Sequence, residues 1–342
     1  MKKTILRAFP VIAVIAGVAF TVNKTVSKRA DHQEHDIAVS VRQSQGHKHS
    51  SSCGDNELRL DALDAVLNMD EERAMPLLLE VLERHGDCDV ELRKKAVFLV
   101  SQQETGETVP VLEGVVRNDP SLEVQEQAVF WLSQVDGAEA VTALESVLFQ
   151  SPRAELQEKA IFALSQHGSA QAQQILRMYV RSDAAESLRE NAIFWLGQEG
   201  SSEDQQFLAE LYGDLHSKAL KEKVIFAVSQ RDNEASRRWL LEVADNDSEL
   251  VELRKNAVFW LSQQGGYDAD QFAALYRDAR EVEIKEQVLF ALSQLDDPDA
   301  VADLIAIARA ETNADLRKNA MFWLGQSSDP RAVQFLAEVI GR

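Results

Sequence analysis

The chain has 342 residues, 45% of them hydrophobic, and its 56 acidic residues outnumber 36 basic ones to give a net charge of −20. This length suits two or three globular domains or one long repeat array. Because a chain this acidic repels nucleic acid and anionic lipid headgroups, we expect neither as a main partner.

Residues 1–22 have the pattern of a targeting segment. Lys2 and Lys3 precede the apolar stretch AFPVIAVIAGVAFTV, whose length is typical of a signal-peptide core. Gly17 and Ala19 are small enough to permit cleavage, yet the apolar run is only slightly short of a membrane span. We therefore expect an exported, periplasmic or otherwise extracytoplasmic protein. It is either secreted after signal cleavage or tethered by an uncleaved N-terminal helix, its one contact with a membrane.

Residues 23–55 are polar and lack helical periodicity, as is typical of a flexible linker. This segment contains four of the seven histidines and one of the two cysteines: His32, His35, His47, His49 and Cys53. Imidazole and thiolate groups bind zinc or copper, so the linker is either a weak, metal-responsive site or a solvated tether. Nothing in the sequence predicts a cofactor.

The two cysteines, Cys53 and Cys88, allow one disulfide. Disulfides persist in exported proteins, so a Cys53–Cys88 bridge is one expectation and a pair of unpaired thiols is the other.

Residues 56–342 contain a twelve-residue motif in eight copies, for example LRKNAVFWLSQQ at 253–264. The copies begin at Leu92, Val124, Leu156, Leu188, Leu220, Leu253, Ile284 and Leu316. Between them run segments with apolar residues at helical spacing, such as AVTALESVLFQ. Asp297 and Asp329, each followed by proline, are expected N-caps. A single hairpin cannot bury its apolar face, so the pattern predicts an all-α solenoid of about eight stacked helical hairpins of about 32 residues with degenerate caps.

The second helix of each hairpin resembles that of HEAT repeats, above all the short HEAT-like repeats of phycobilisome (bilin) lyases. The matching residues are, for example, Leu188, Arg189, Ala192, Ile193, Leu196 and Gly197, and again Leu316, Arg317, Ala320, Met321, Leu324 and Gly325. The resemblance implies a right-handed α-solenoid whose second helices line the concave face, and it implies binding more often than catalysis. The chain departs from the family pattern in its constant phenylalanine and in having serine for glycine in most copies.

The constant phenylalanine occupies the seventh position of every copy: Phe98, Phe130, Phe162, Phe194, Phe226, Phe259, Phe290 and Phe322. At about 100° per residue it points away from the face that buries the leucines. A glutamine follows four residues later: Gln102, Gln134, Gln166, Gln198, Gln230, Gln263, Gln294 and Gln326. These residues either form a concave surface that binds a protein or extended peptide, or pack on one another between repeats.

The eighth position alternates between large and small residues, which predicts a 64-residue double repeat with big-against-small core packing. The residues are Leu99, Trp131, Ala163, Trp195, Ala227, Trp260, Ala291 and Trp323. The third position is always Lys or Glu and predicts a solvated charged stripe: Lys94, Glu126, Glu158, Glu190, Glu222, Lys255, Glu286 and Lys318.

No phosphate loop, nucleophile elbow or zinc-protease motif occurs, and His85, His167 and His216 are scattered. We therefore predict a non-enzymatic protein-interaction scaffold of the cell envelope that uses the concave phenylalanines and glutamines. The alternatives are a metal-buffering envelope protein that uses the histidine-rich linker and, less favoured, a lyase or chaperone-like repeat protein.

Overall fold

The computed structural model describes residues 56–103, 105–264, 266, 268–295 and 297–341. Within these ranges the chain forms eighteen α-helices and one short 3₁₀ helix at Asp87–Asp89, and no strand. The all-α repeat fold predicted from the sequence is confirmed. The chain divides into two units, Met1–Ser51 and Ser52–Arg342, and the helices that the structure describes belong to the second.

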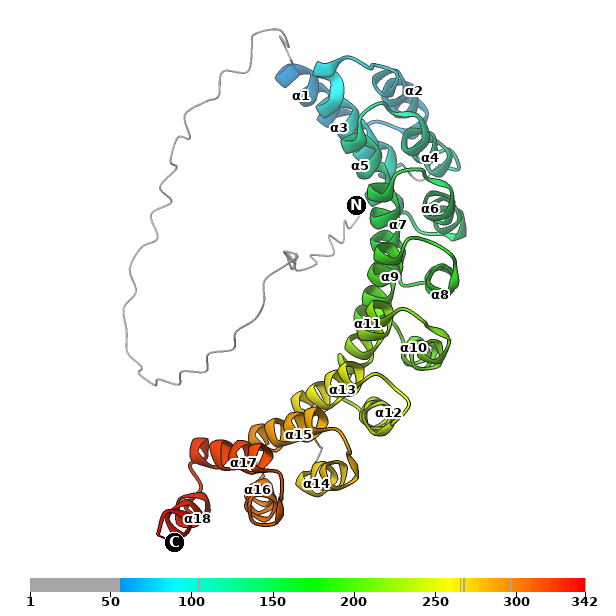
Figure 1. Ribbon diagram of the computed structural model, residues 1–342. Coiled ribbons are helices and arrows are strands. Elements are labelled where there is room, and N and C mark those ends of the chain that lie inside the picture. Colours follow the sequence, from blue (N-terminus) through cyan, green and yellow to red (C-terminus); the bar gives the residue numbers. More distant parts are fainter. Residues whose placement is uncertain (1–55, 104, 265, 267, 296, 342) are drawn as a thin grey trace, which may run out of the picture. The chain divides into compact units, whose positions relative to one another are not determined.

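In Figure 1 the odd-numbered helices of this second unit form an inner row and the even-numbered helices an outer row. The inner helices are α1 (Asn56–Val66), α3 (Val90–Ser101), α5 (Leu122–Leu132), α7 (Ala154–His167), α9 (Glu186–Glu199), α11 (Lys218–Ser229), α13 (Val251–Gln263), α15 (Val282–Gln294) and α17 (Ala314–Gln326). The outer helices are α2 (Glu71–Leu82), α4 (Thr108–Asn118), α6 (Ala138–Gln150), α8 (Ala170–Arg181), α10 (Ser202–Asp214), α12 (Glu234–Asp245), α14 (Ala269–Asp278), α16 (Pro298–Ala310) and α18 (Pro330–Ile340).

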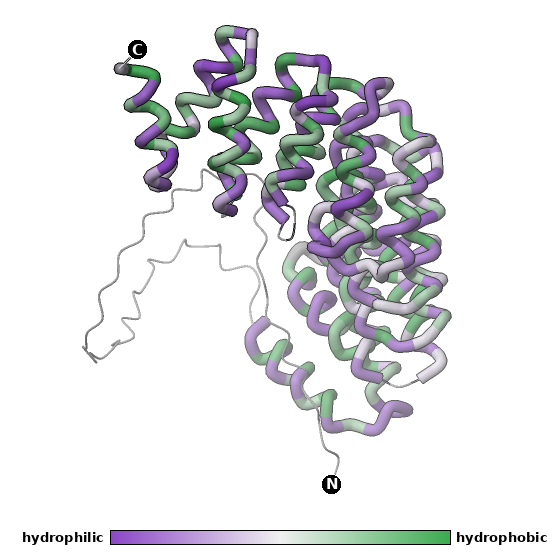
Figure 2. Tube along the Cα trace, turned by 90° about the horizontal axis from the view of Figure 1, so that it is seen from below, coloured by the Kyte–Doolittle hydropathy of each residue, from purple (hydrophilic) through white to green (hydrophobic). Residues whose placement is uncertain are grey.

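The core lies between the two rows, because each helix has one apolar face. In α9, for instance, Leu188, Ala192 and Leu196 follow one another at four-residue spacing and all are buried. Figure 2 shows the corresponding mixture of hydrophobic and hydrophilic positions along each helix. Each hairpin packs on its neighbours, so the core is continuous from one repeat to the next.

Side-chain caps fix where several outer helices begin. Asp297 accepts a hydrogen bond from the backbone N–H of Asp299, and Asp329 accepts one from the backbone N–H of Arg331. In both helices proline is the first residue, as predicted, because its missing N–H leaves no unsatisfied donor there.

Two buried arginines tie consecutive hairpins together. Arg254 in α13 donates from Nε to the carbonyl oxygen of Ala244, 2.9 Å away, and from Nη1 to the Glu281 carboxylate at 2.9 Å. Ala244 belongs to the outer helix of the same hairpin, and Glu281 precedes the next inner helix. Arg93 in α3 makes the equivalent pair with Asp119, with Nε 2.8 Å from Oδ2. These charge-assisted contacts fix the register between repeats.

Cys88 is disulfide-bonded. The chain has one other cysteine, Cys53, which lies outside the described residues, as do the targeting segment predicted at 1–22, the linker at 23–55 and the linker histidines. Among the helices that the structure does describe, none is both long enough and apolar enough to cross a bilayer.

Candidate interaction surface

The inner helices carry a row of aromatic side chains, which we call the inner aromatic row. It consists of Phe98, Phe130, Phe162, Phe194, Phe226, Phe259, Phe290 and Phe322 with Trp131, Trp195, Trp260 and Trp323. None of the twelve is buried: Phe130, Phe259 and Phe322 are exposed, at 42%, 36% and 57%, and the other nine are half-buried. The row therefore belongs neither to the buried core nor to the fully exposed surface.

Each indole lies between the phenylalanine of its own helix and that of the preceding inner helix. Trp131, for example, has its ring centroid 4.8 Å from that of Phe98 and 5.0 Å from that of Phe130. The other three tryptophans repeat this arrangement at centroid distances of 4.9 to 5.5 Å. Such tilted and edge-to-face pairs stabilise by about 0.5–1.5 kcal/mol beyond the area they bury. The tryptophans thus join the phenylalanines across repeats, while the alternating residues Leu99, Ala163, Ala227 and Ala291 are buried.

Two further contacts join phenylalanines face to face. Phe194 and Phe226 stack at 6.1 Å with an interplanar angle of 4°, and Phe259 and Phe290 stack at 6.3 Å with an angle of 11°. As a result, nine rings from Phe162 to Phe322 form one unbroken series.

A three-atom relay explains the serine that replaces the family glycine. In six inner helices the serine Oγ donates to the carbonyl oxygen of the phenylalanine three residues earlier, over 2.6 to 2.7 Å. The following glutamine donates from Nε2 to that Oγ over 2.9 to 3.3 Å. The serine hydroxyl thus adds a second hydrogen bond to a carbonyl near the helix end; the Phe130 carbonyl, for example, also accepts from the backbone N–H of Ser133. Sequence reasoning missed this relay, although the Phe-x-x-Ser-Gln spacing contains it.

All eight glutamines of the motif are exposed: Gln102, Gln134, Gln166, Gln198, Gln230, Gln263, Gln294 and Gln326. The relay uses an N–H of the amide, and no hydrogen bond within the described residues engages the Oε1 atom of any of the eight. The inner surface therefore offers a line of hydrogen-bond acceptors beside the aromatic rings.

The two copies that keep glycine differ in their surroundings. A Cβ atom at Gly197 would lie 2.6 Å from the Cβ and 2.8 Å from the Cα of Ala227, so only glycine allows α9 and α11 to approach this closely. At Gly325 a Cβ would meet no atom within 4 Å, because no further inner helix follows α17 in the described chain.

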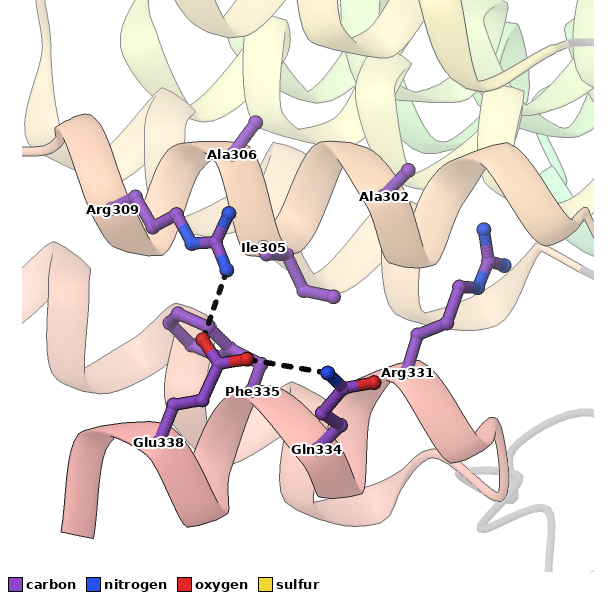
Figure 3. A pocket seen from close by; sticks show the side chains of 8 residues that line it. All are labelled: Ala302, Ile305, Ala306, Arg309, Arg331, Gln334, Phe335 and Glu338. Carbon is purple, nitrogen blue, oxygen red and sulfur yellow. Dashed lines mark hydrogen bonds and ion pairs between the residues drawn. The ribbon is translucent and has the colours of Figure 1, made fainter. Parts of the chain in front are cut away.

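Three hollows of the described surface are lined mainly by outer helices, with Gln125, Leu156 and Val228 contributed by inner helices. Their volumes are about 330, 460 and 640 Å³. Figure 3 shows the first, between α16 and α18, where the Arg309 guanidinium is 3.2 Å from the Glu338 carboxylate. That carboxylate also accepts from the Gln334 amide at 3.3 Å. These residues satisfy one another and present no nucleophile with an adjacent base.

Among the described residues no group of three or more His, Cys, Asp or Glu side chains is arranged to hold a metal ion. The scattered His85, His167 and His216 lie apart from one another on the described chain. The described part of the molecule therefore offers the inner aromatic row as its one extended candidate site.

Comparison with known proteins identifies the repeat type. A family model described as HEAT repeats matches residues 109–197 and 141–229, and one described as PBS lyase HEAT-like repeat matches residues 316–341. The chain therefore contains HEAT repeats over residues 109–229 and, at residues 316–341, a repeat of the HEAT-like type found in PBS lyases. No curated protein matches the sequence.

Solved structures of similar architecture include human deoxyhypusine hydroxylase in complex with glycerol, at 20% identity and a TM-score of 0.33, covering 70% of this chain and 90% of that one. YibA from E. coli is 14% identical at a TM-score of 0.38, covering 83% and 100% of the two chains. The CpcE–CpcF complex of phycocyanin lyase from Nostoc sp. PCC7120 is 14% identical at 0.33, covering 73% and 93%. At these TM-scores the likenesses carry no inference about activity or partner.

Proposed function

We propose that this HEAT-repeat protein is a non-enzymatic scaffold whose inner aromatic row binds another protein along an extended segment. The observation that carries the proposal is the partial exposure of twelve aromatic rings that repeat along nearly the whole stack. A contiguous series of partly exposed aromatic side chains is unusual on a monomer, and aromatic residues are enriched where proteins bind. The unused glutamine Oε1 atoms beside them suit the backbone N–H groups of an extended chain.

Affinity capture from the native cells tests this proposal. A variant with Phe130→Ala and Phe259→Ala removes two exposed rings of the inner row. A matched control with Phe149→Ala and Met178→Ala removes two exposed apolar side chains of the outer row, at 42% and 45% exposure. We expect proteins held by the wild type to be held by the control and lost from the inner-row variant. Retention by the inner-row variant, or equal loss from both, would contradict the proposal.

We further propose that the protein works outside the cytoplasm, in the cell envelope. The support is the sequence of residues 1–22, with its two leading lysines and apolar stretch. Protease added to intact cells with a permeabilised outer layer should digest the repeat unit. Full protection until the cytoplasmic membrane is broken would place the protein inside.

A further inference from the structure

The inner aromatic row is interrupted at one place, between α5 and α7. The inner helices α5, α9 and α13 each carry a tryptophan and are followed by another inner helix. After α9, Phe194 stacks on Phe226, and after α13, Phe259 stacks on Phe290. No ring contact among the described residues joins the equivalent pair, Phe130 and Phe162. Phe130 is 42% exposed, compared with 36% for the stacked Phe259, and the stacked Phe194 is half-buried. We call this place the Phe130–Phe162 gap.

The gap is also the most acidic part of the inner surface. Glu123 and Glu126 lie seven and four residues before Phe130, on the same face of α5. Glu155 and Glu158 have the same relation to Phe162 in α7. At the same positions the closed pair Phe194–Phe226 has two acidic residues, Glu190 and Glu222. The closed pair Phe259–Phe290 has three acidic residues and one basic residue there: Glu252, Glu283, Glu286 and Lys255.

These four carboxylates are only partly neutralised. Lys94 Nζ lies 3.6 Å from Glu123, and Lys159 Nζ lies 3.9 Å from Glu126, so four negative charges against two positive ones leave −2. No ion pair among the described residues involves Glu155 or Glu158. One turn after the rings, the exposed side chains of Gln134 and Gln166 add amide oxygens that accept hydrogen bonds and engage no donor among the described residues.

Resting on the function proposed above, we propose that the Phe130–Phe162 gap holds an arginine side chain of an extended, basic segment of the partner protein. A guanidinium is planar and stacks on aromatic faces, while its five N–H groups donate to carboxylate and amide oxygens. A cation already lies over a ring of this row, since Lys95 Nζ is 5.6 Å from the centroid of Phe98. The net charge of −20 also attracts a basic partner.

The test uses the full chain and a labelled, serine-rich peptide with several spaced arginines, titrated by fluorescence anisotropy at about 0.15 M salt. A second peptide replaces each arginine by citrulline, which keeps the shape but removes the charge. We expect the citrulline peptide to bind about tenfold more weakly. Equal affinity for the two peptides would overturn the proposal.

Matched variants locate the site. Phe130→Ala, and separately Glu155→Gln with Glu158→Gln, should each weaken binding roughly fivefold. Phe149→Ala, on outer helix α6, and Glu139→Gln with Glu242→Gln, which remove the same charge from exposed positions of outer helices, should leave the affinity unchanged. If either control weakens binding as much as its counterpart, the peptide is bound by net charge alone and the gap has no role. Circular dichroism shows that each variant remains folded.

Different results would contradict the proposed scaffold function and the proposed arginine site. If a captured partner depends on the inner row but contacts the gap with a segment that lacks arginine, the scaffold function stands and the arginine site is wrong. If the arginine peptide binds at the gap while inner-row variants retain every captured protein, the function is wrong and the gap chemistry stands.

Discussion

Whether the tenth position of the motif can hold serine depends on the room for its Cβ atom. Where neighbouring inner helices leave room, serine occupies the position and its Oγ pairs with the phenylalanine carbonyl, as Ser133 does with Phe130 at 2.6 Å. Where the helices approach more closely, as at Gly197, no side chain fits. Helix spacing therefore requires glycine at position 197, whereas the open space at Gly325 would also accept serine.

We predict that Gly197→Ser destabilises the protein, whereas Gly325→Ser does not. The new Cβ at position 197 would overlap the backbone of Ala227, and overpacking of this kind costs about 1–3 kcal/mol. At position 325 the space is open, and the serine can form the carbonyl contact seen in the other copies. Urea unfolding followed by circular dichroism measures both, and equal midpoints for the two variants would contradict the prediction.

The ionisation of Glu249 predicts that the free energy of unfolding depends on pH. Burial raises the pKa of its carboxyl, but hydrogen bonds from Lys221 Nζ at 2.7 Å and from the backbone N–H of Leu250 at 2.9 Å outweigh burial and lower the pKa below its usual value. A lowered native pKa gives stability that is present above the unfolded pKa and is lost as the pH falls through the native one.

We therefore expect Glu249→Gln to cost about 2 kcal/mol at pH 7 and progressively less below about pH 4. The control is Glu242→Gln, which changes an exposed carboxylate of α12, the outer helix that precedes Glu249. It should have little effect at any pH. Urea midpoints at a series of pH values check this, and a difference that stays constant down to pH 2 would show that Glu249 does not act through its charge.

At the scale of the helices, the inner aromatic row joins repeats as well as presenting a surface. Phe226 contacts both Phe194 and Trp260, at 6.1 and 5.2 Å, whereas Phe322 contacts only Trp323, at 4.9 Å. The rings therefore pack on one another between repeats, which is one of the two interpretations left open by the sequence, and they remain partly exposed. That they bind a partner is our proposal.

Truncating these rings should cost part of what a buried ring costs. We expect Phe226→Ala to lose about half of the roughly 3–5 kcal/mol typical of a buried Phe→Ala change. Phe322→Ala should lose only about 1 kcal/mol, because its ring is 57% exposed and has one aromatic neighbour. Urea unfolding ranks the two, and the opposite order would mean that ring contacts do not join the repeats.

The buried arginines give a second prediction for helix packing. Arg254→Met removes the donor to Ala244 and leaves the half-buried Glu281 carboxylate without its partner, which costs about 1–3 kcal/mol. Arg317 holds the same motif position in α17 but is exposed, so Arg317→Met is the control and should change little. Thermal unfolding checks the pair, and similar melting curves for both variants would refute the register role of Arg254.

At the scale of the whole molecule, the repeat period could be predicted from the sequence because every copy packs on its neighbours in the same way. The spacing of Leu188, Ala192 and Leu196, repeated eight times, predicts the inner helices, and Asp297 and Asp329 predict two helix starts. The interrupted stack at Phe130 and Phe162 could not be predicted, because the two motifs on either side of it match the others at every ring position. It depends on small differences in how neighbouring helices pack, which a linear pattern does not record.

The central claim is that the inner aromatic row faces a bound protein. Photo-crosslinking in the native cells tests it most directly, with a photoreactive phenylalanine placed at position 130 and, as control, at position 149. Both natural rings are 42% exposed. Phe130 contacts Trp131 and Phe149 contacts Tyr179, but Phe149 lies on the outer helix α6. We predict a discrete adduct from position 130 and none from position 149. Adducts from 149 alone, or from neither position, would contradict the account.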